Sequence, residues 1–102
     1  MPLMEISIIP LGTKSPSVSK YVADALKILE EYKGIKYELS SMGTVIESGS
    51  LDILFDIAEK MHNRVLGSDV KRVVTSIKID DRTDKKISIK SKKNSVQEKK
   101  NE

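Results

Sequence analysis

The fold is decided by two stretches, Ser41-Met-Gly-Thr-Val-Ile-Glu47 and Val73-Val-Thr-Ser-Ile-Lys-Ile-Asp-Asp-Arg-Thr-Asp-Lys85. Each places apolar residues at every second position and then runs into polar residues. This alternation is typical of a β-strand that buries one of its two faces. A helical pattern of apolar residues precedes each stretch, at residues 17 to 33 and again after Ser50. The two stretches therefore predict a domain that mixes strands and helices.

The remaining elements follow from the same periodicities. Met4 to Pro10 alternates and predicts the first strand, with Pro10 expected to end its ladder. Ser15 or Ser17 is a predicted cap for the first helix, and Ser50 for the second. The predicted apolar stripes of the helices are Val18, Val22, Ala25, Leu29 and Tyr32, and then Leu51, Leu54, Phe55, Ala58, His62 and Val65.

The order strand, helix, strand, strand, helix, strand predicts a ferredoxin-like α+β fold. It has a four-stranded antiparallel sheet with both helices on one face. Ile87 and Ile89 fall in a short third helix at the C-terminal end. We expect one domain over residues 1–96 and a disordered, Lys-rich tail over 97–102.

The hairpin that contains the first stretch has a predicted two-residue turn at Met42 and Gly43, so that Ser41 pairs with Thr44. Thr44 then shares a face with Leu39, and Glu47 shares the opposite face with Ser40. A tight primed turn needs positive φ where Met42 stands, so a longer turn remains an alternative.

Composition restricts the function further. The 102 residues include no Cys, which excludes disulfides and thiolate metal sites. No apolar run is long enough for a membrane span, so we expect a cytoplasmic protein with no membrane partner. The net charge of +3 is uneven, because seven Lys lie in the last twenty residues. The rest of the chain is nearly neutral, which argues against nucleic acid as a partner.

Two helices leave one side of the sheet without cover. Such a side can be solvated or can associate with a second copy of the chain. We favour association, because Ile9, Val45 and Val74 have no other evident cover. The side chains predicted on this side are Glu5, Ser7, Ile9, Lys36, Glu38, Ser40, Val45, Glu47, Val74, Ser76 and Lys78.

Four short motifs carry a resemblance to a known family. They are Pro10-Leu-Gly-Thr13, Ser17-Val-Ser-Lys-Tyr-Val22, Tyr37-Glu-Leu followed by Met42-Gly-Thr-Val-Ile-Glu47, and Ile77-Lys-Ile-Asp-Asp-Arg-Thr-Asp-Lys85. In this order, from about residue 4 to residue 96, they resemble the small thiamine-binding-like proteins of archaea, bacteria and yeast. The resemblance implies a ferredoxin-like fold, homodimers or homotetramers, no established catalysis, and binding of thiamine or its hydroxymethylpyrimidine part.

Thiamine carries a permanent positive charge and an aminopyrimidine ring with donor and acceptor edges, so its site needs a carboxylate, hydroxyls and apolar contacts. The predicted ligand-binding residues, placed at a subunit interface, are Glu47, Thr44, Ser40, Ser7, Met42 and Ile9. The alternative for Glu47 is an ion pair with Lys36 or Lys78 across the sheet.

Two further groups of polar residues are candidates for binding or assembly. Thr13, Ser17 and Ser19 surround the start of the first helix, where they either bind an anion or simply cap the helix. Arg82, Asp84 and Lys85 are predicted to tie the C-terminal segment to a neighbouring subunit.

Catalysis and RNA binding are the alternative classes of function. His62 is the only histidine and lies on the predicted apolar stripe, where a packed histidine is the usual interpretation. Asp80, Asp81 and Asp84 are interleaved with Arg82 and Lys85, which favours a charge network over a metal site. Tyr37 is the only strand aromatic, and it falls on the helix side of the sheet, away from any exposed RNA surface. We therefore predict a binding protein without a catalytic residue, metal or cofactor. The alternative is a structural or regulatory homo-oligomer that binds another small anion or metabolite, and RNA binding is a distant third.

Overall fold

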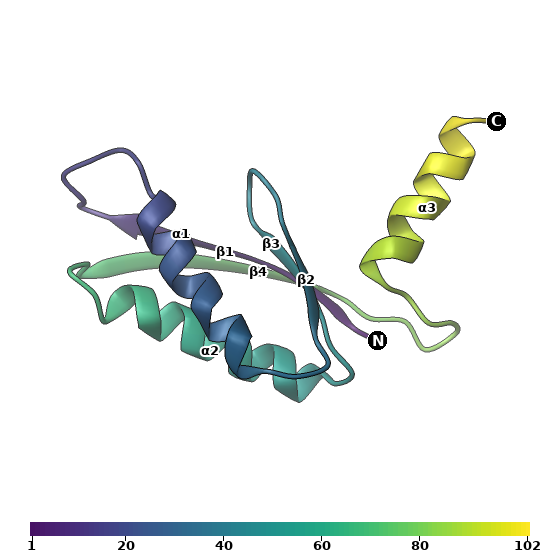
Figure 1. The fold of residues 1–102 in the computed structure, drawn as a ribbon, viewed down its shortest axis with the longest axis horizontal. Coiled ribbons are helices and arrows are strands. Elements are labelled where there is room, and N and C mark those ends of the chain that lie inside the picture. The colour runs from purple at the N-terminus through teal and green to yellow at the C-terminus, as the bar shows by residue number, and fades with distance from the viewer.

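The computed structural model describes all 102 residues and shows the predicted ferredoxin-like α+β fold (Figure 1). Two helical elements cover one side of a four-stranded sheet, and a third helix projects from the body at the C-terminal end. The elements in chain order are β1 (Leu3–Leu11), α1 (Ser19–Leu26), the 3₁₀ helix η1 (Lys27–Glu31), β2 (Lys36–Leu39), β3 (Thr44–Glu47), α2 (Leu51–Leu66), β4 (Arg72–Asp80) and α3 (Ile89–Lys100).

The strand order is β2-β3-β1-β4, and every neighbouring pair is antiparallel. Met4 pairs with Ile46 on one side and with Ile79 on the other, and Glu5 pairs with Val45 and Lys78 in the same way. Directly paired residues share a face of the sheet, so these two rows lie on opposite faces. We call the side beneath α1 and α2 the covered face, and the side with Glu5, Ser7, Ile9, Val45, Val74, Ser76 and Lys78 the open face.

The core lies between the covered face and the two helices. Met4, Ile6 and Ile46 have at most 2% of their surface exposed. The helices cover them with Tyr21, Ala25, Ile28 and Leu29 from the first helical segment, and with Leu54, Ile57, Ala58, Met61 and Val65 from α2. Of these, Ala25, Leu29, Leu54, Ala58 and Val65 were predicted, and the other four were not. Leu51 and Phe55, which were predicted to be buried, are exposed. Both helices carry more apolar residues than one face can bury, so periodicity alone left their rotation ambiguous.

The first helix is shorter than the predicted span of 17 to 33. Its α-helical part begins at Ser19, its last turn is 3₁₀, and neither Ser15 nor Ser17 caps it, because the N-cap is Val18 without a side-chain hydrogen bond. Ser17 instead donates its backbone N–H to Ser15 Oγ at 3.1 Å. The predicted cap of α2 is present, since Ser50 Oγ accepts the N–H of Ile53 at 3.4 Å.

The β2–β3 hairpin has a four-residue connection rather than the two-residue turn at Met42 and Gly43. Leu39 pairs with Thr44, and Ser40 donates its N–H to the carbonyl of Gly43 at 2.8 Å. No residue other than glycine has a positive φ, so the primed turn that Met42 would have disfavoured is avoided. The shift in pairing is two residues, which leaves every side chain on its predicted face.

Both ends of the chain extend their elements beyond the prediction. β1 continues through Pro10 to Leu11. In this part it pairs with β4 but no longer with β3, so the strand is at an edge of the sheet. An edge position tolerates the missing N–H of Pro10. Residues 97–102 were predicted to be disordered, but α3 continues to Lys100. A capping box formed by Ser88 and Ser91 stabilises its start, and Lys99 and Lys100 lie in its last turn, where cations favour a helix. No helix of the structure has both the length and the apolar character needed to cross a membrane.

Candidate ligand site on the open face

The first turns of α3 lie across the open face. Lys92 forms an ion pair with Asp80 at the end of β4, and Lys93 Nζ lies 2.9 Å from Glu38 Oε1 on β2. β2 and β4 are the two outer strands of the sheet, so these contacts anchor α3 at both edges. One end of the open face is therefore roofed by a helix, while the rest of that face has no cover.

Glu47 joins the roof to the sheet. Its side chain is buried, and Oε1 accepts the backbone N–H of Ile89, the first residue of α3, at 2.9 Å. A carboxylate at this position satisfies one of the free N–H groups of the helix and interacts favourably with the positive end of its dipole. Neither Lys36 nor Lys78 forms an ion pair with Glu47, so the alternative of a cross-strand pair is not what the structure shows.

A groove of about 550 Å³ lies between the open face and α3. Its floor comes from all four strands and the hairpin turn, and its roof from the first two turns of α3. It combines apolar surface, carboxylates, a hydroxyl and ammonium groups. The lining residues are Leu3, Glu5, Glu38, Ser40, Val45, Lys78, Ile79, Asp80, Ile89, Lys92 and Lys93. A second hollow of about 490 Å³ adjoins it at the β2 edge, between Lys36, Glu38 and Glu47 and the residues of α3.

Glu5 is the carboxylate of this groove that remains available. Glu38 and Asp80 are neutralised by Lys93 and Lys92, whereas Glu5 forms no ion pair and is exposed. It lies on β1 in the row between Val45 and Lys78. The sequence placed Glu5 on this face but not in the site, because the third helix was not expected to lie above it.

Of the six residues predicted to bind the ligand, only Ser40 lines the groove. Its Oγ donates to the carbonyl of Gly43 at 2.8 Å. Ser7 and Ile9 lie farther along the open face, paired with Ser76 and Val74. Met42 is at the exposed tip of the hairpin, with 84% of its surface accessible. Thr44 is buried on the covered face, where it lines a small internal cavity, so it lies on the opposite side of the sheet from Glu47.

The two other predicted groups occupy opposite ends of the chain. Thr13 and Ser17 line a separate cavity at the end of β1, and Ser19 is the exposed first residue of α1. Arg82 Nε donates to Asp84 Oδ1 at 2.8 Å, and this contact holds the pKa of Asp84 below its ordinary value. Lys85 is exposed next to them, so this segment presents a neutralised pair and one free cation.

His62 and Tyr37, the candidates for catalysis and RNA binding, have contacts that hold the fold together. Nδ1 of His62 lies 2.7 Å from Oγ1 of Thr75, a contact that joins α2 to β4. Asp80 pairs with Lys92 and Asp84 with Arg82, and no three His, Asp or Glu side chains lie close enough together to hold a metal ion. Tyr37 pairs with Ile46 on the covered face, at its outer edge.

Comparison with known proteins agrees with this architecture. Residues 4–97 match the family model described as thiamine-binding protein. UPF0045 protein YqgV of Bacillus subtilis strain 168 is 48% identical over 99 residues, covering 94% of each chain. The crystal structure of protein MJ1052 of Methanocaldococcus jannaschii is 45% identical and superposes with a TM-score of 0.85, covering 95% of this chain and 96% of that one. A Thermotoga maritima structure with 20% identity and a TM-score of 0.76 shares the fold. With nearly its whole length matched, the chain belongs to the thiamine-binding protein family.

Proposed function

We propose that this protein binds thiamine or its hydroxymethylpyrimidine part, without catalysing a reaction, in the groove between the open face and α3. The observation that carries the proposal is that groove, in which an unpaired carboxylate lies beside apolar surface under a helix. The match to the thiamine-binding family supports the choice of ligand. Such a protein would sequester thiamine or report its concentration.

The chemistry of the groove suits this ligand. The Glu5 carboxylate can neutralise the thiazolium cation or accept hydrogen bonds from the aminopyrimidine amino group. Leu3, Val45 and Ile89 provide apolar contacts for the ring faces, and Ser40 adds a hydroxyl. A volume of about 550 Å³ lies in the range of small-molecule sites.

Glu47 has an indirect role in this proposal. Its carboxylate holds the N-terminus of α3 and so fixes the roof of the groove. The predicted residue is retained, but as a positioning residue rather than as the group that contacts the cation.

A second copy of the chain would complete the site. Ile9 and Val74 form an apolar pair on the uncovered part of the open face, with 49% and 44% of their surfaces exposed. Ser7 and Ser76 beside them are small enough to let two sheets approach closely. We propose a dimer through this surface, with Met42 at its margin and with Arg82, Asp84 and Lys85 contacting a neighbouring subunit in a tetramer.

Charge reversal by Arg82→Glu should then lower the assembly size in light scattering, and an unchanged tetramer would contradict that role.

Titration calorimetry with thiamine tests the ligand and the site together. Wild-type protein should bind saturably, and Glu5→Gln should weaken the affinity at least about tenfold, because a charge-assisted contact is lost. Glu47→Gln should weaken it severalfold by loosening α3. Glu59→Gln is the matched control, since Glu59 is an exposed carboxylate on α2 without an ion pair.

The calorimetric results distinguish the role of Glu5, the location of the site and the identity of the ligand. Unchanged affinity in Glu5→Gln would remove that carboxylate from the site, and unchanged affinity in both variants would remove the groove. Absence of saturable binding by the wild type would reject thiamine as the ligand.

A further inference from the structure

A cavity of about 900 Å³ opens at the end of the molecule away from α3. One wall is the loop that follows β1, where Gly12 reverses the chain with a φ of +76°. The other wall is the connection from α2 to β4, and Tyr21 of α1 lies between them. This cavity shares no residue with the groove under α3, so its chemistry needs a separate explanation.

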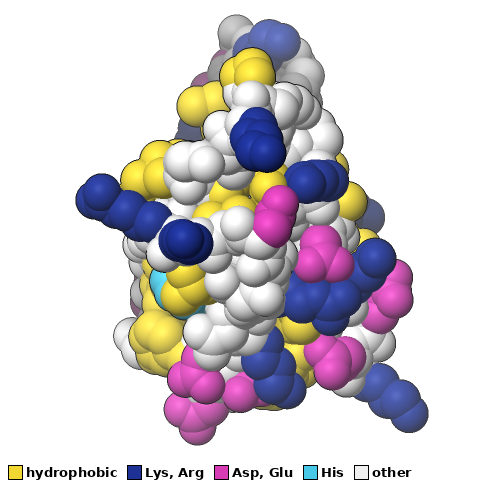
Figure 2. Space-filling model, turned by 90° about the vertical axis from the view of Figure 1, so that its left-hand side faces the viewer, with side chains coloured by type: hydrophobic (Ala, Val, Ile, Leu, Met, Phe, Trp, Pro, Cys, Tyr) yellow, Lys and Arg dark blue, Asp and Glu magenta, His cyan; other side chains and the backbone are white.

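Basic side chains dominate the cavity. Lys14, Lys20, Lys71 and Arg72 line it, against one carboxylate, Asp69. Figure 2 faces this end and shows dark-blue Lys and Arg side chains standing around it. Residues 1–82 as a whole carry eleven basic and twelve acidic residues, so this concentration of positive charge is local. A hollow lined by one sign of charge focuses the field and attracts ions of the opposite sign.

Most of these cations have no partner within the protein. Asp69 accepts a hydrogen bond from the Tyr21 hydroxyl at 3.1 Å and lies 3.7 Å from Lys20 Nζ. Lys14, Lys71 and Arg72 take part in no ion pair. The one carboxylate is thus already engaged, and three positive side chains remain for a ligand.

Polar groups of the β1–α1 loop complement the cations. Thr13, Ser15 and Ser17 line the same cavity, and α1 begins beside it with no side-chain cap. The positive end of the helix dipole therefore adds to the field of the basic side chains. Arg72 contributes the planar guanidinium that can bind two oxygens of one phosphate group.

We propose that this cavity binds the phosphate group of a small phosphorylated metabolite. Arg72, Lys14 and Lys71 would hold the phosphate, and the remaining volume would accept the organic part of the molecule. A metabolite fits better than a nucleic acid, because the cations surround a hollow rather than follow a stripe, and the lining includes no exposed aromatic ring for base stacking. The proposal is independent of thiamine binding in the groove.

Calorimetric titration with ribose 5-phosphate and inorganic phosphate at low ionic strength tests it. Ribose 5-phosphate should bind saturably, and inorganic phosphate should compete. Arg72→Gln should weaken binding about tenfold or more, with Arg72→Lys in between, because lysine keeps the charge but loses the bidentate contact. Lys33→Gln is the control, since Lys33 is exposed, without an ion pair, and absent from the cavity lining.

The double variant Lys14→Gln with Lys71→Gln removes two cations without touching a strand. It should also weaken binding at least about tenfold, while thiamine affinity stays that of the wild type. The proposal is overturned if ribose 5-phosphate does not saturate the wild type, or if Arg72→Gln loses no more affinity than Lys33→Gln. It is also overturned if duplex DNA binds and neither small anion competes.

Discussion

The two faces of one sheet have opposite characters in this protein. On the covered face, Met4 and Ile46 are fully enclosed by α1 and α2. On the open face, Glu5 and Ile9 of the same strand β1 are exposed, and only the first turns of α3 lie above one end. Because side chains along β1 point alternately to the two faces, the residues that stabilise the fold are separated from those available to bind a ligand or a second copy of the chain. Substitutions on the covered face should therefore alter the stability of the fold, and substitutions on the open face should alter ligand binding or assembly.

Truncation of an apolar side chain should have very different effects on the two faces. Leu54→Ala removes a side chain with no exposed surface, and it should lower the free energy of unfolding by about 2–5 kcal/mol. Ile9→Ala should lower it by less than about 1 kcal/mol, because Ile9 is already half exposed. Urea unfolding of both variants measures the difference. Equal losses would mean that the open face is buried in the folded protein in solution.

A charge on the open face should change assembly rather than folding. Ile9→Lys places an ammonium group in the proposed sheet-to-sheet contact, and it should raise the dimer dissociation constant at least about tenfold. Sedimentation velocity at micromolar concentration measures this change. Ile53→Lys is the matched control, because Ile53 is a comparably exposed residue of α2. If the wild type sediments as a single protomer, the contact does not exist.

Loosening α3 should affect the open face alone. Ser88→Ala removes the capping box and should destabilise the start of α3 by about 1 kcal/mol. Hydrogen exchange should therefore become about fivefold faster at the amides of its first turn, with the core amides unchanged. Ser95→Ala in the middle of the same helix is the control. Equal protection in both variants would show that Glu47, rather than the cap, holds the helix.

The sequence predicted those features that depend on period-two alternation. Strand faces were predicted correctly for all four strands. The two-residue shift in the β2–β3 pairing does not change them, because a shift by two residues returns each side chain to its own side. Ser50 as the cap of α2 was also predicted correctly, since a hydroxyl before an apolar stripe is a local signal.

Features that depend on tertiary contacts were not predictable in the same way. The stripe predicted for α2 was correct at Leu54, Ala58 and Val65. It was wrong at Leu51 and Phe55, because these residues continue the apolar pattern onto a side of the helix that the core does not bury. The position of α3 was missed because its contacts are made by Lys92, Lys93 and Glu47, none of which is distinguished by local pattern. The groove could not be derived without that helix, and so Glu5 was not recognised as its free carboxylate.

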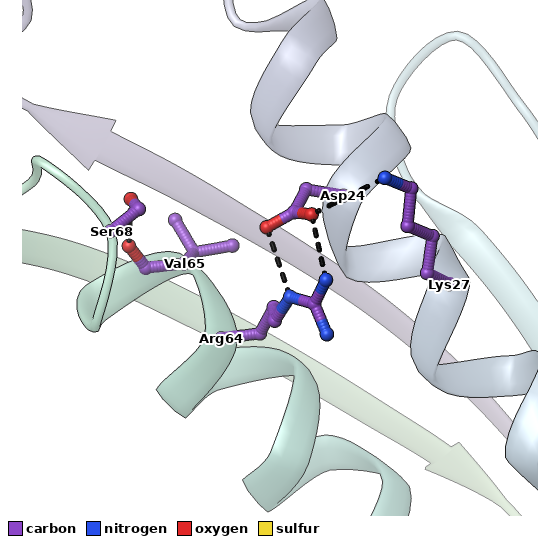
Figure 3. Close-up of polar contacts among 5 residues, drawn as sticks. All are labelled: Asp24, Lys27, Arg64, Val65 and Ser68. Atoms are coloured by element: carbon purple, nitrogen blue, oxygen red, sulfur yellow. Dashed lines mark hydrogen bonds and ion pairs between the residues drawn. The ribbon is translucent and has the colours of Figure 1, made fainter.

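The smallest predicted effect concerns the polar link between the two helices above the covered face (Figure 3). Asp24 of α1 accepts two hydrogen bonds from Arg64 of α2, both at 3.1 Å, and lies 3.8 Å from Lys27. The hydrogen bond from Arg64 lowers the pKa of Asp24 below its ordinary value of 3.8.

A lowered pKa means that the folded state favours the ionised form of Asp24. The link therefore stabilises the protein above the ordinary pKa, and this stabilisation is lost as the pH falls through the pKa of the folded state. Asp24→Asn should therefore melt slightly below the wild type at neutral pH, and the two melting temperatures should converge as the pH falls below the lowered pKa of Asp24. Asp81→Asn, which removes an exposed carboxylate without an ion pair, should not show this convergence. A gap between Asp24→Asn and wild type that stays constant down to the most acidic pH would assign the loss to helix packing instead of charge, and the covered face would then owe its stability to apolar contacts alone.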